Sequence, residues 1–394
     1  MLKNYTKEIF EEKKNDMENI RMVDLQGQYQ QIEKPLSEKM KAVIESTAFI
    51  NGPAVQEFQK NLEAYLGVKH VIPCANGTDA LQIALMGLGL KPGDEVITAD
   101  FTFAATVEVI ALLGLTPVLV DVDPQTFNLD LEAVAARIGA RTKAIIPVHL
   151  FGQTVDMEPL MALAKTHQLY VVEDNAQAIG ATYTFSSGEK QKAGTIGDIG
   201  TTSFFPSKNL GAYGDGGALF TNDDALAHAL RGIVNHGMYQ RYHHDVVGVN
   251  SRLDALQAAV LDTKLPLLDF YNERRKMAAA LYTERLQANE AITTPHRSGD
   301  CDSHVFHQYT LKIKGVDRDK LVQQLGAFGI PTGVYYPIPL HSQKAYTDPG
   351  YNESDFKVTN QIVNEVLSLP MHTELTVEQI DYICEKLLHS VASN

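Results

Sequence analysis

Apolar and polar positions alternate in this 394-residue chain with two different periods. Near the beginning the spacing is helical. An amphipathic helix is expected over residues 36–44, and a second follows the turn at residues 51–53, where apolar side chains recur every three or four positions from Val55 to Leu66. Each of these helices is expected to bury one face.

From residue 71 onward, short apolar runs alternate with longer amphipathic ones. Repeated strand–helix–strand units with short connections predict a mostly parallel sheet with helices on both faces. In such sheets ligands bind beyond the carboxyl ends of the strands. The expected strands are 71–74, 95–98, 117–122, 144–148, 169–173, 201–205 and 217–221, and the helices between them are 80–88, 104–113, 131–138 and 157–167.

The last third of the chain has a different pattern. A helix is expected over 223–236, then a polar loop at 241–244, and a long helical stretch over 253–286. We expect an N-terminal extension (1–23), a large α/β domain with seven strands (24–260), and a connecting helix with a small α+β domain (261–394). The small domain is expected to contain strands at 308–314 and 331–336 and helices at 319–329 and 377–388.

Charge and cysteine content narrow the class of protein. The formal net charge of −14 argues against a nucleic-acid or anionic-membrane partner, which would require clustered positive charge. The three cysteines, Cys74, Cys301 and Cys384, are too scattered for a disulfide framework or a metal site. No apolar run is long enough to span a membrane, and the first residues lack a secretory signal. These features favour a cytoplasmic enzyme.

Lys208 is the first candidate for chemistry. It lies between the aromatic approach Ser203-Phe204-Phe205-Pro206 and a run of glycines from Gly211 to Gly217, whereas surface lysines usually lie among other charges. We therefore interpret Lys208 as a reactive amine.

Three other motifs fall at or just beyond the expected strand ends. Asp174 closes an apolar strand, where a buried acid needs a cationic partner, although it could also cap the next helix. Gly77 and Thr78 precede a helix and could hold a phosphate, or form an ordinary turn. Phe103 could stack on a flat ring or belong to the core. Together, a lysine, a carboxylate, a phosphate-holding turn and an aromatic match the requirements of pyridoxal 5'-phosphate (PLP) chemistry.

The order of motifs resembles the DegT/StrS-type nucleotide-sugar aminotransferases, which have the fold type I PLP-dependent architecture. The resemblance extends from residue 24 almost to the end of the chain. It implies that Lys208 forms the internal aldimine, that Asp174 contacts the pyridine nitrogen, and that Phe103 stacks on the ring. The strings that carry the resemblance are GTDA, FTFAAT, VEDNAQAIGA, SFFPSKNLGAYGDGGA, GVNSRLDALQAA, YPIPL and SLPM.

The family pattern also assigns the remaining cofactor contacts. It implies that Gln177 binds the phenolic oxygen of the cofactor and that Gly77, Thr78 and Ser203 bind its phosphate. Asn250 would reach the phosphate from a second subunit, which makes a homodimer the expected assembly.

Within the family, the strings SFFPSK, YGDGG, RYHH, GVNSRLD and YPIPL are similar to those of enzymes that aminate a UDP-linked 3-keto uronic acid for bacterial surface polysaccharides such as O-antigen. Glutamate would donate the amino group in a ping-pong reaction. Arg252 would bind the sugar carboxylate, or form an interface salt bridge, and Tyr336 would contact the sugar. Tyr335 departs from the usual histidine, and His243 and His244 are expected to face solvent.

Two neighbouring functions are less consistent with these residues. Sugar dehydratases of the family replace the Schiff-base lysine with histidine or recruit an iron–sulfur cluster, whereas this chain keeps Lys208 and scatters its cysteines. For an aminotransferase, a 3- or 4-keto deoxyhexose nucleotide is the alternative to the UDP-linked uronic acid as amino acceptor. A non-catalytic regulator on the same fold would need a basic DNA-binding segment, which the sequence does not supply.

Overall fold

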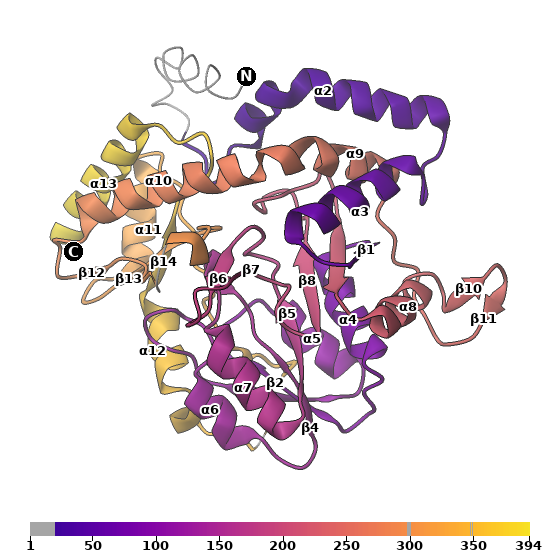
Figure 1. The fold of residues 1–394 in the computed structure, drawn as a ribbon. Helices are drawn as coiled ribbons and strands as arrows, with labels where there is room; N and C mark the ends of the chain where they lie inside the picture. Colours follow the sequence, from indigo (N-terminus) through magenta and orange to yellow (C-terminus); the bar gives the residue numbers. More distant parts are fainter. Residues whose placement is uncertain (1–19, 298–300, 347, 349) are drawn as a thin grey trace.

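A seven-stranded sheet forms the centre of the protein (Figure 1). The computed structural model describes residues 20–297, 301–346, 348 and 350–394, so most of the predicted N-terminal extension lies outside the described residues. The strands are parallel except β9, which runs antiparallel to both of its neighbours. This confirms the predicted mostly parallel α/β sheet. The strand order is β1 (His70–Cys74), β9 (Gly217–Thr221), β8 (Ile199–Ser203), β5 (Tyr170–Asp174), β4 (Thr142–Ile146), β2 (Glu95–Ala99), β3 (Thr116–Val120).

Most of the strands contain consecutive apolar residues, so helices must cover the sheet to remove these side chains from water. Val171 and Val172 of β5 are adjacent and both fully buried, so the two faces of this strand are both removed from water. Polar residues start the helices: Asn76, Asp130 and Asp223 each accept a backbone N–H in the first turn of the helix that follows. The covering helices are α4 (Gly77–Gly87), α5 (Ala105–Leu112), α6 (Leu131–Arg137), α7 (Met157–His167) and α8 (Asp224–Ile233).

Four further helices run along one side of the molecule, where α9 and α10 form a nearly continuous rod (Figure 1). The predicted helix at 253–286 is divided by a 3-10 turn that contains Pro266, which has no N–H to continue the α-helical ladder. The predicted helix at 36–44 is longer than expected and continues through Pro35, because Ile32 and Leu36 are buried on both sides of the proline. These helices are α2 (Leu25–Ser46), α3 (Pro53–Leu66), α9 (Ala255–Lys264) and α10 (Leu268–Leu286).

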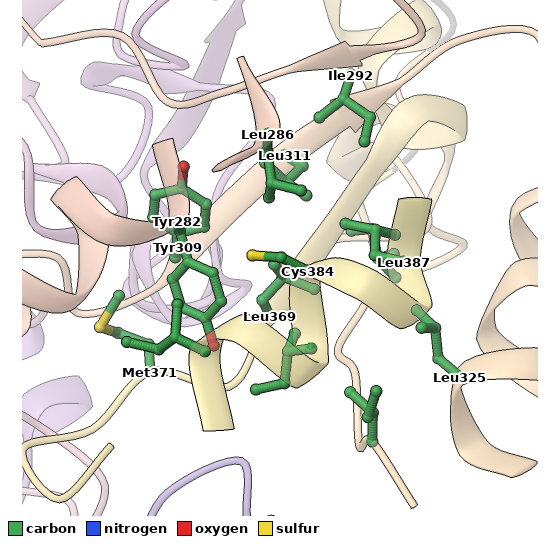
Figure 2. Close-up of a cluster of buried hydrophobic side chains, with 14 of the residues drawn as sticks. Tyr282, Leu286, Ile292, Tyr309, Leu311, Leu325, Leu369, Met371, Cys384 and Leu387 are labelled. Atoms are coloured by element: carbon green, nitrogen blue, oxygen red, sulfur yellow. The ribbon is translucent and has the colours of Figure 1, made fainter. Parts of the chain in front are cut away.

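The C-terminal part has its own antiparallel sheet and core. Figure 2 shows Tyr282 of α10 and Tyr309 of β13 with the apolar side chains of α13, including Cys384 and Leu387. The predicted strand at 331–336 is wrong: this segment is irregular and makes only a single bridge, from Gly333 to Ser368. The elements are β12 (Ile292–Thr293), β13 (Tyr309–Ile313), β14 (Val366–Leu369), α11 (Arg318–Ala327), α12 (Lys357–Glu365) and α13 (Val377–Ala392).

Two small hairpins were not predicted. The expected polar loop at 241–244 forms the end of a hairpin, β10 (Met238–Gln240) with β11 (His243–His244), which projects from the body of the protein (Figure 1). A second hairpin pairs β6 (Thr182–Thr184) with β7 (Lys190–Lys192). His243 and His244 are exposed, as the sequence suggested.

Within the described residues, no helix is both long and apolar enough to cross a membrane. Cys74 and Cys384 are buried free thiols, and burial raises the pKa of Cys384 to about 12.

Candidate active site

Lys208 lies in the loop that joins β8 to β9, at the carboxyl edge of the sheet. The loop folds back on itself: the Phe204 N–H donates to Gly216 O (2.7 Å), and the Lys208 N–H donates to Phe205 O (2.8 Å). Gly211 is required there, because a Cβ atom would lie 2.2 Å from Pro206 O. Burial lowers the pKa of the Lys208 amine to about 8, and the negative charge of Asp174 acts in the opposite direction.

Asp174 is the last residue of β5, and its carboxylate is held by two donors. Thr106 Oγ1 donates to Oδ2 (2.8 Å), and the Ala176 N–H donates to Oδ1 (3.1 Å). The side chain is almost fully buried. A fixed carboxylate therefore lies within electrostatic range of Lys208.

The preceding residue, Glu173, faces a different part of the fold, because side chains alternate along a strand. Its carboxylate accepts hydrogen bonds from His149 Nε2 (2.9 Å) and from the backbone N–H groups of Gly194, Ile196 and Gly197 (2.6–2.8 Å). His149 Nδ1 accepts from the Val155 N–H, so its proton is on Nε2. Glu173 therefore anchors the strand end that presents Asp174.

Gln177 and Tyr336 form another wall of the site. Gln177 Nε2 donates to Tyr336 Oη (3.2 Å), while its Oε1 accepts the Phe151 N–H (2.6 Å). The Tyr336 ring lies 6.1 Å from that of Phe103 and 6.0 Å from that of Phe101. Phe101 is buried, whereas Phe103 is 56% exposed. Phe103 is therefore the aromatic with a face free to stack.

The turn at Gly77 packs against the end of β8. A Cβ atom at residue 77 would lie 2.6 Å from Ser203 Cβ, so only glycine allows this approach. Thr78 follows in the first turn of α4, which Asn76 caps by accepting the Asp79 N–H (2.8 Å). The N–H groups of this helix start lie beside the Ser203 side chain, an arrangement that suits an anion.

Two further candidates, Asn250 and Arg252, lie in the loop before α9. Asn250 is exposed and Arg252 is half-buried. Among the described residues, neither side chain makes a hydrogen bond or ion pair with Asp174 or Lys208. Ser251, between them, is fully buried and accepts the Ala75 N–H (3.0 Å). The loop that carries Asn250 is thus fixed next to the glycine turn of its own chain.

The residues fit a flat cofactor that carries an aldehyde, a pyridine nitrogen and a phosphate. Lys208 supplies an amine, Asp174 an acceptor, Phe103 an open ring face and Gly77 a helix start. His307 adds an independent observation: its buried Nδ1 has no hydrogen-bond partner among the described residues. Burial and the positive charges of Lys208 and Arg275 hold the imidazole pKa well below its usual range, so the ring is neutral.

The sequence did not single out Thr106 and His307 as parts of this site, nor His149, which supports it through Glu173. Thr106 and His149 follow β2 and β4 at the same carboxyl edge as Asp174, so the strand-end rule could have found them. His307 comes from the segment before β13, and no local pattern relates it to Lys208.

Three comparisons with known proteins bear on this site. A model of the DegT/DnrJ/EryC1/StrS aminotransferase family matches residues 30–388. A UDP-2-acetamido-2-deoxy-3-oxo-D-glucuronate aminotransferase of Pseudomonas aeruginosa is 45% identical over 368 residues, which cover 93% of this chain and 99% of the relative. A pleiotropic regulatory protein of Geobacillus stearothermophilus is 47% identical over 371 residues, with coverage of 94% and 98%.

The fold also matches solved structures. The crystal structure of S. venezuelae DesV in complex with a ketimine intermediate has a TM-score of 0.90 and 37% identity, and the match covers 95% of this chain and 98% of that one. The similarity therefore extends over nearly the whole chain.

Proposed function

This chain belongs to the DegT/DnrJ/EryC1/StrS aminotransferase family of PLP-dependent enzymes, and we propose that it transfers an amino group from glutamate to a UDP-linked 3-keto N-acetyl-hexuronate. The product would enter bacterial surface polysaccharide. The active form would be a cytoplasmic homodimer.

The observation that carries this proposal is the pairing of a buried carboxylate, Asp174 held by Thr106, with the Lys208 amine on which its charge acts; burial lowers the pKa of that amine to about 8. An amine must be neutral to attack a carbonyl carbon, and burial makes the neutral form accessible near physiological pH. When bound, PLP supplies an electron sink that stabilises negative charge at the substrate carbon.

The residues of this chain would bind and orient the reactants. Asp174, fixed by Thr106, would accept a hydrogen bond from the pyridine nitrogen and keep it protonated. Gln177 would face the phenolic oxygen, and Phe103 would cover one face of the ring. Once released from the cofactor, the Lys208 amine would carry a proton from one carbon to another.

The phosphate contacts come from two places in the fold. Gly77, Thr78 and Ser203 lie together at the start of α4, where backbone N–H groups favour an anion. Asn250 is exposed, so its side chain would be free to reach the phosphate of a second subunit, as the family pattern implies.

The choice of sugar rests on Arg252 and on the relative from P. aeruginosa. The planar guanidinium group suits a carboxylate, and that relative is named for a 3-oxo-glucuronate. Tyr336 lies next to Phe103, with 6.1 Å between the ring centroids, and a sugar would contact its hydroxyl or ring. A 3- or 4-keto deoxyhexose nucleotide is the alternative acceptor, since it needs no carboxylate partner.

A panel assay tests the proposal. The PLP-loaded chain is incubated with glutamate and with UDP-linked 3-keto uronate, 3-keto hexose and 4-keto hexose, while 2-oxoglutarate release is followed. The proposal predicts multiple turnovers with the 3-keto uronate and at most slow turnover with the others. If only the neutral 4-keto sugar is turned over rapidly, the proposed 3-keto uronate is not the substrate. A chain that binds no PLP would refute the enzyme assignment.

A further inference from the structure

One face of helix α10 contacts three loops that bear on Lys208. Asn272 and Arg275 are three residues apart, so their side chains lie on the same side of the helix. Both side chains are only 3% exposed. Burial of an amide and a guanidinium group is costly unless their donors are used. Asn272 Nδ2 and Arg275 Nη1 donate to backbone carbonyls, whereas Arg275 Nε has no partner among the described residues.

Asn272 joins the loop of Lys208 to the turn of Gln177. Its Oδ1 accepts a hydrogen bond from Asn209 Nδ2 (2.7 Å), and its Nδ2 donates to Ile179 O (3.1 Å). Asn209 is the residue next to Lys208, and Ile179 lies two residues after Gln177. The fit is tight, because a Cβ atom at Gly180 would lie 2.4 Å from Asn272 Nδ2.

Asn209 also reaches a third segment. Its Nδ2 donates to Val305 O (3.1 Å), and the side chain is 4% exposed. The chain then passes Phe306 and His307, whose carbonyls both accept from Arg275 Nη1 (3.2 Å each). Arg275 Nη1 also donates to Met371 O (3.0 Å).

These contacts fix the relative positions of groups that the chemistry requires together. Lys208 has no helix or strand of its own to hold it, since it lies in a loop between β8 and β9. The side chain of its neighbour is instead held by α10, and the same helix residue holds the Gln177 turn. A displacement of about 1 Å between reacting groups can reduce a rate by roughly 100-fold.

We propose that Asn272 and Asn209 are positioning residues for the reaction: they set the reach of the Lys208 amine relative to Gln177 through the backbone of both loops. This inference rests on the proposed PLP-dependent function. The hydrogen bonds of these two side chains among the described residues go to each other and to the backbone of Val305 and Ile179, so the expected effect is on rate and not on cofactor affinity.

The test compares Asn272→Leu and Asn209→Ala with wild-type protein. Asn272→Leu keeps the branched outline of the side chain, with bulkier methyl groups, and removes both hydrogen bonds of the amide. Asn209→Ala leaves α10 unchanged. Asn364→Leu is the matched control, because Asn364 is exposed on α12 and its one hydrogen bond among the described residues is to Asn360 O in the same helix. All chains are loaded with PLP, and folding is verified by thermal unfolding.

Three quantities are measured for each chain: PLP affinity, the KM for glutamate, and the first-order rate at which glutamate bleaches the visible absorbance of bound PLP. The inference predicts that both variants keep PLP affinity and KM within about threefold, while the bleaching rate falls about 10- to 100-fold. The Asn364→Leu control should match wild-type protein.

Three outcomes separate the alternatives. Bleaching rates within twofold of wild type in a folded variant would overturn the inference and leave the proposed function intact. A joint loss of PLP affinity and rate, in proportion to the unfolded fraction, would also overturn it, since it would show a purely structural role. If Asn272→Leu fails to fold, Asn209→Ala decides. Wild-type protein that takes up no PLP would instead refute the proposed function itself.

Discussion

Thr106 Oγ1 donates a hydrogen bond to Asp174 Oδ2 at 2.8 Å, and both side chains are buried. The two residues belong to different strand–helix units: Thr106 is in the first turn of α5 and Asp174 ends β5. The parallel sheet brings them to one edge. The hydroxyl restricts the carboxylate to one orientation before any cofactor binds.

Replacing Thr106 with valine tests this contact. The two side chains have nearly the same shape, so Thr106→Val removes one donor to the carboxylate with little change in packing. Since a hydrogen bond to a charged group contributes about 1.5–3 kcal/mol, PLP affinity is expected to fall about 10- to 100-fold. Fluorescence or absorbance titration measures it. Thr166→Val, at an exposed threonine of α7, is the control; equal affinities of Thr106→Val and wild type would contradict the role of this contact.

The capture of PLP by Lys208 should depend on pH. Because only the neutral amine attacks, and burial lowers the pKa to about 8, the capture rate should rise with pH and level off above about 8. Asp174 raises this pKa, so Asp174→Asn should move the midpoint to lower pH. Stopped-flow absorbance at a series of pH values gives both midpoints. A wild-type midpoint near 10, or an upward shift in the variant, would contradict this description of the amine.

Much of the fold and part of the site could be predicted from sequence because their signals are local. The apolar strands and the glycines around Lys208 can be recognised from short runs of consecutive residues. Helix α2 was underestimated because Pro35 suggests a break, while the buried contacts that override it involve Val260, far along the chain. The segment at 331–336 has apolar and aromatic residues but pairs only at Gly333, which no local pattern indicates.

Within the site too, residues of one motif could be predicted, whereas contacts between distant residues could not. Asp174 and Gln177 belong to one short motif, so the sequence could single them out. The contacts of Thr106 with Asp174 and of Asn209 with Asn272 join residues that are 68 and 63 positions apart. Such pairs depend on how the sheet and the helices pack, and the periodicity of a single segment does not contain that information.

Lys264, which is not among the proposed active-site residues, tests the effect of burial on the pKa of a lysine amine. Its amine is fully buried in α9, donates to Gly211 O (2.8 Å) and has a pKa that burial lowers to about 7. Between pH 7 and 10.5 the unfolded chain binds a proton that the folded chain does not, so stability should rise with pH across this window.

The expected contribution of Lys264 is at most about 1.4 kcal/mol per pH unit. Lys264→Met should remove it, so the difference in Tm between wild type and variant should grow in favour of wild type from pH 7 to pH 9.5. Thermal unfolding at several pH values measures the difference. Lys41→Met, at an exposed lysine, should show no such trend. Parallel curves for wild type and Lys264→Met would contradict the lowered pKa.

Arg252 determines the predicted preference for an acidic sugar. A bidentate contact with a carboxylate is charge-assisted, so Arg252→Ala should reduce kcat/KM for a 3-keto uronate about 10- to 100-fold while a neutral 3-keto sugar changes less than threefold. Arg252→Lys keeps the charge without the planar fork and should recover only part of the activity. Equal losses on both sugars would assign Arg252 to the assembly of the site and not to the sugar carboxylate.

The most direct test of the account is the site of PLP attachment. The protein is loaded with PLP, reduced with borohydride, digested and analysed by mass spectrometry. Lys264 is an internal comparison, because its amine is also buried with a lowered pKa. We expect a pyridoxyl adduct on Lys208, none on Lys264, and no adduct in Lys208→Ala. An adduct on another lysine, or none at all in a folded chain, would contradict this expectation.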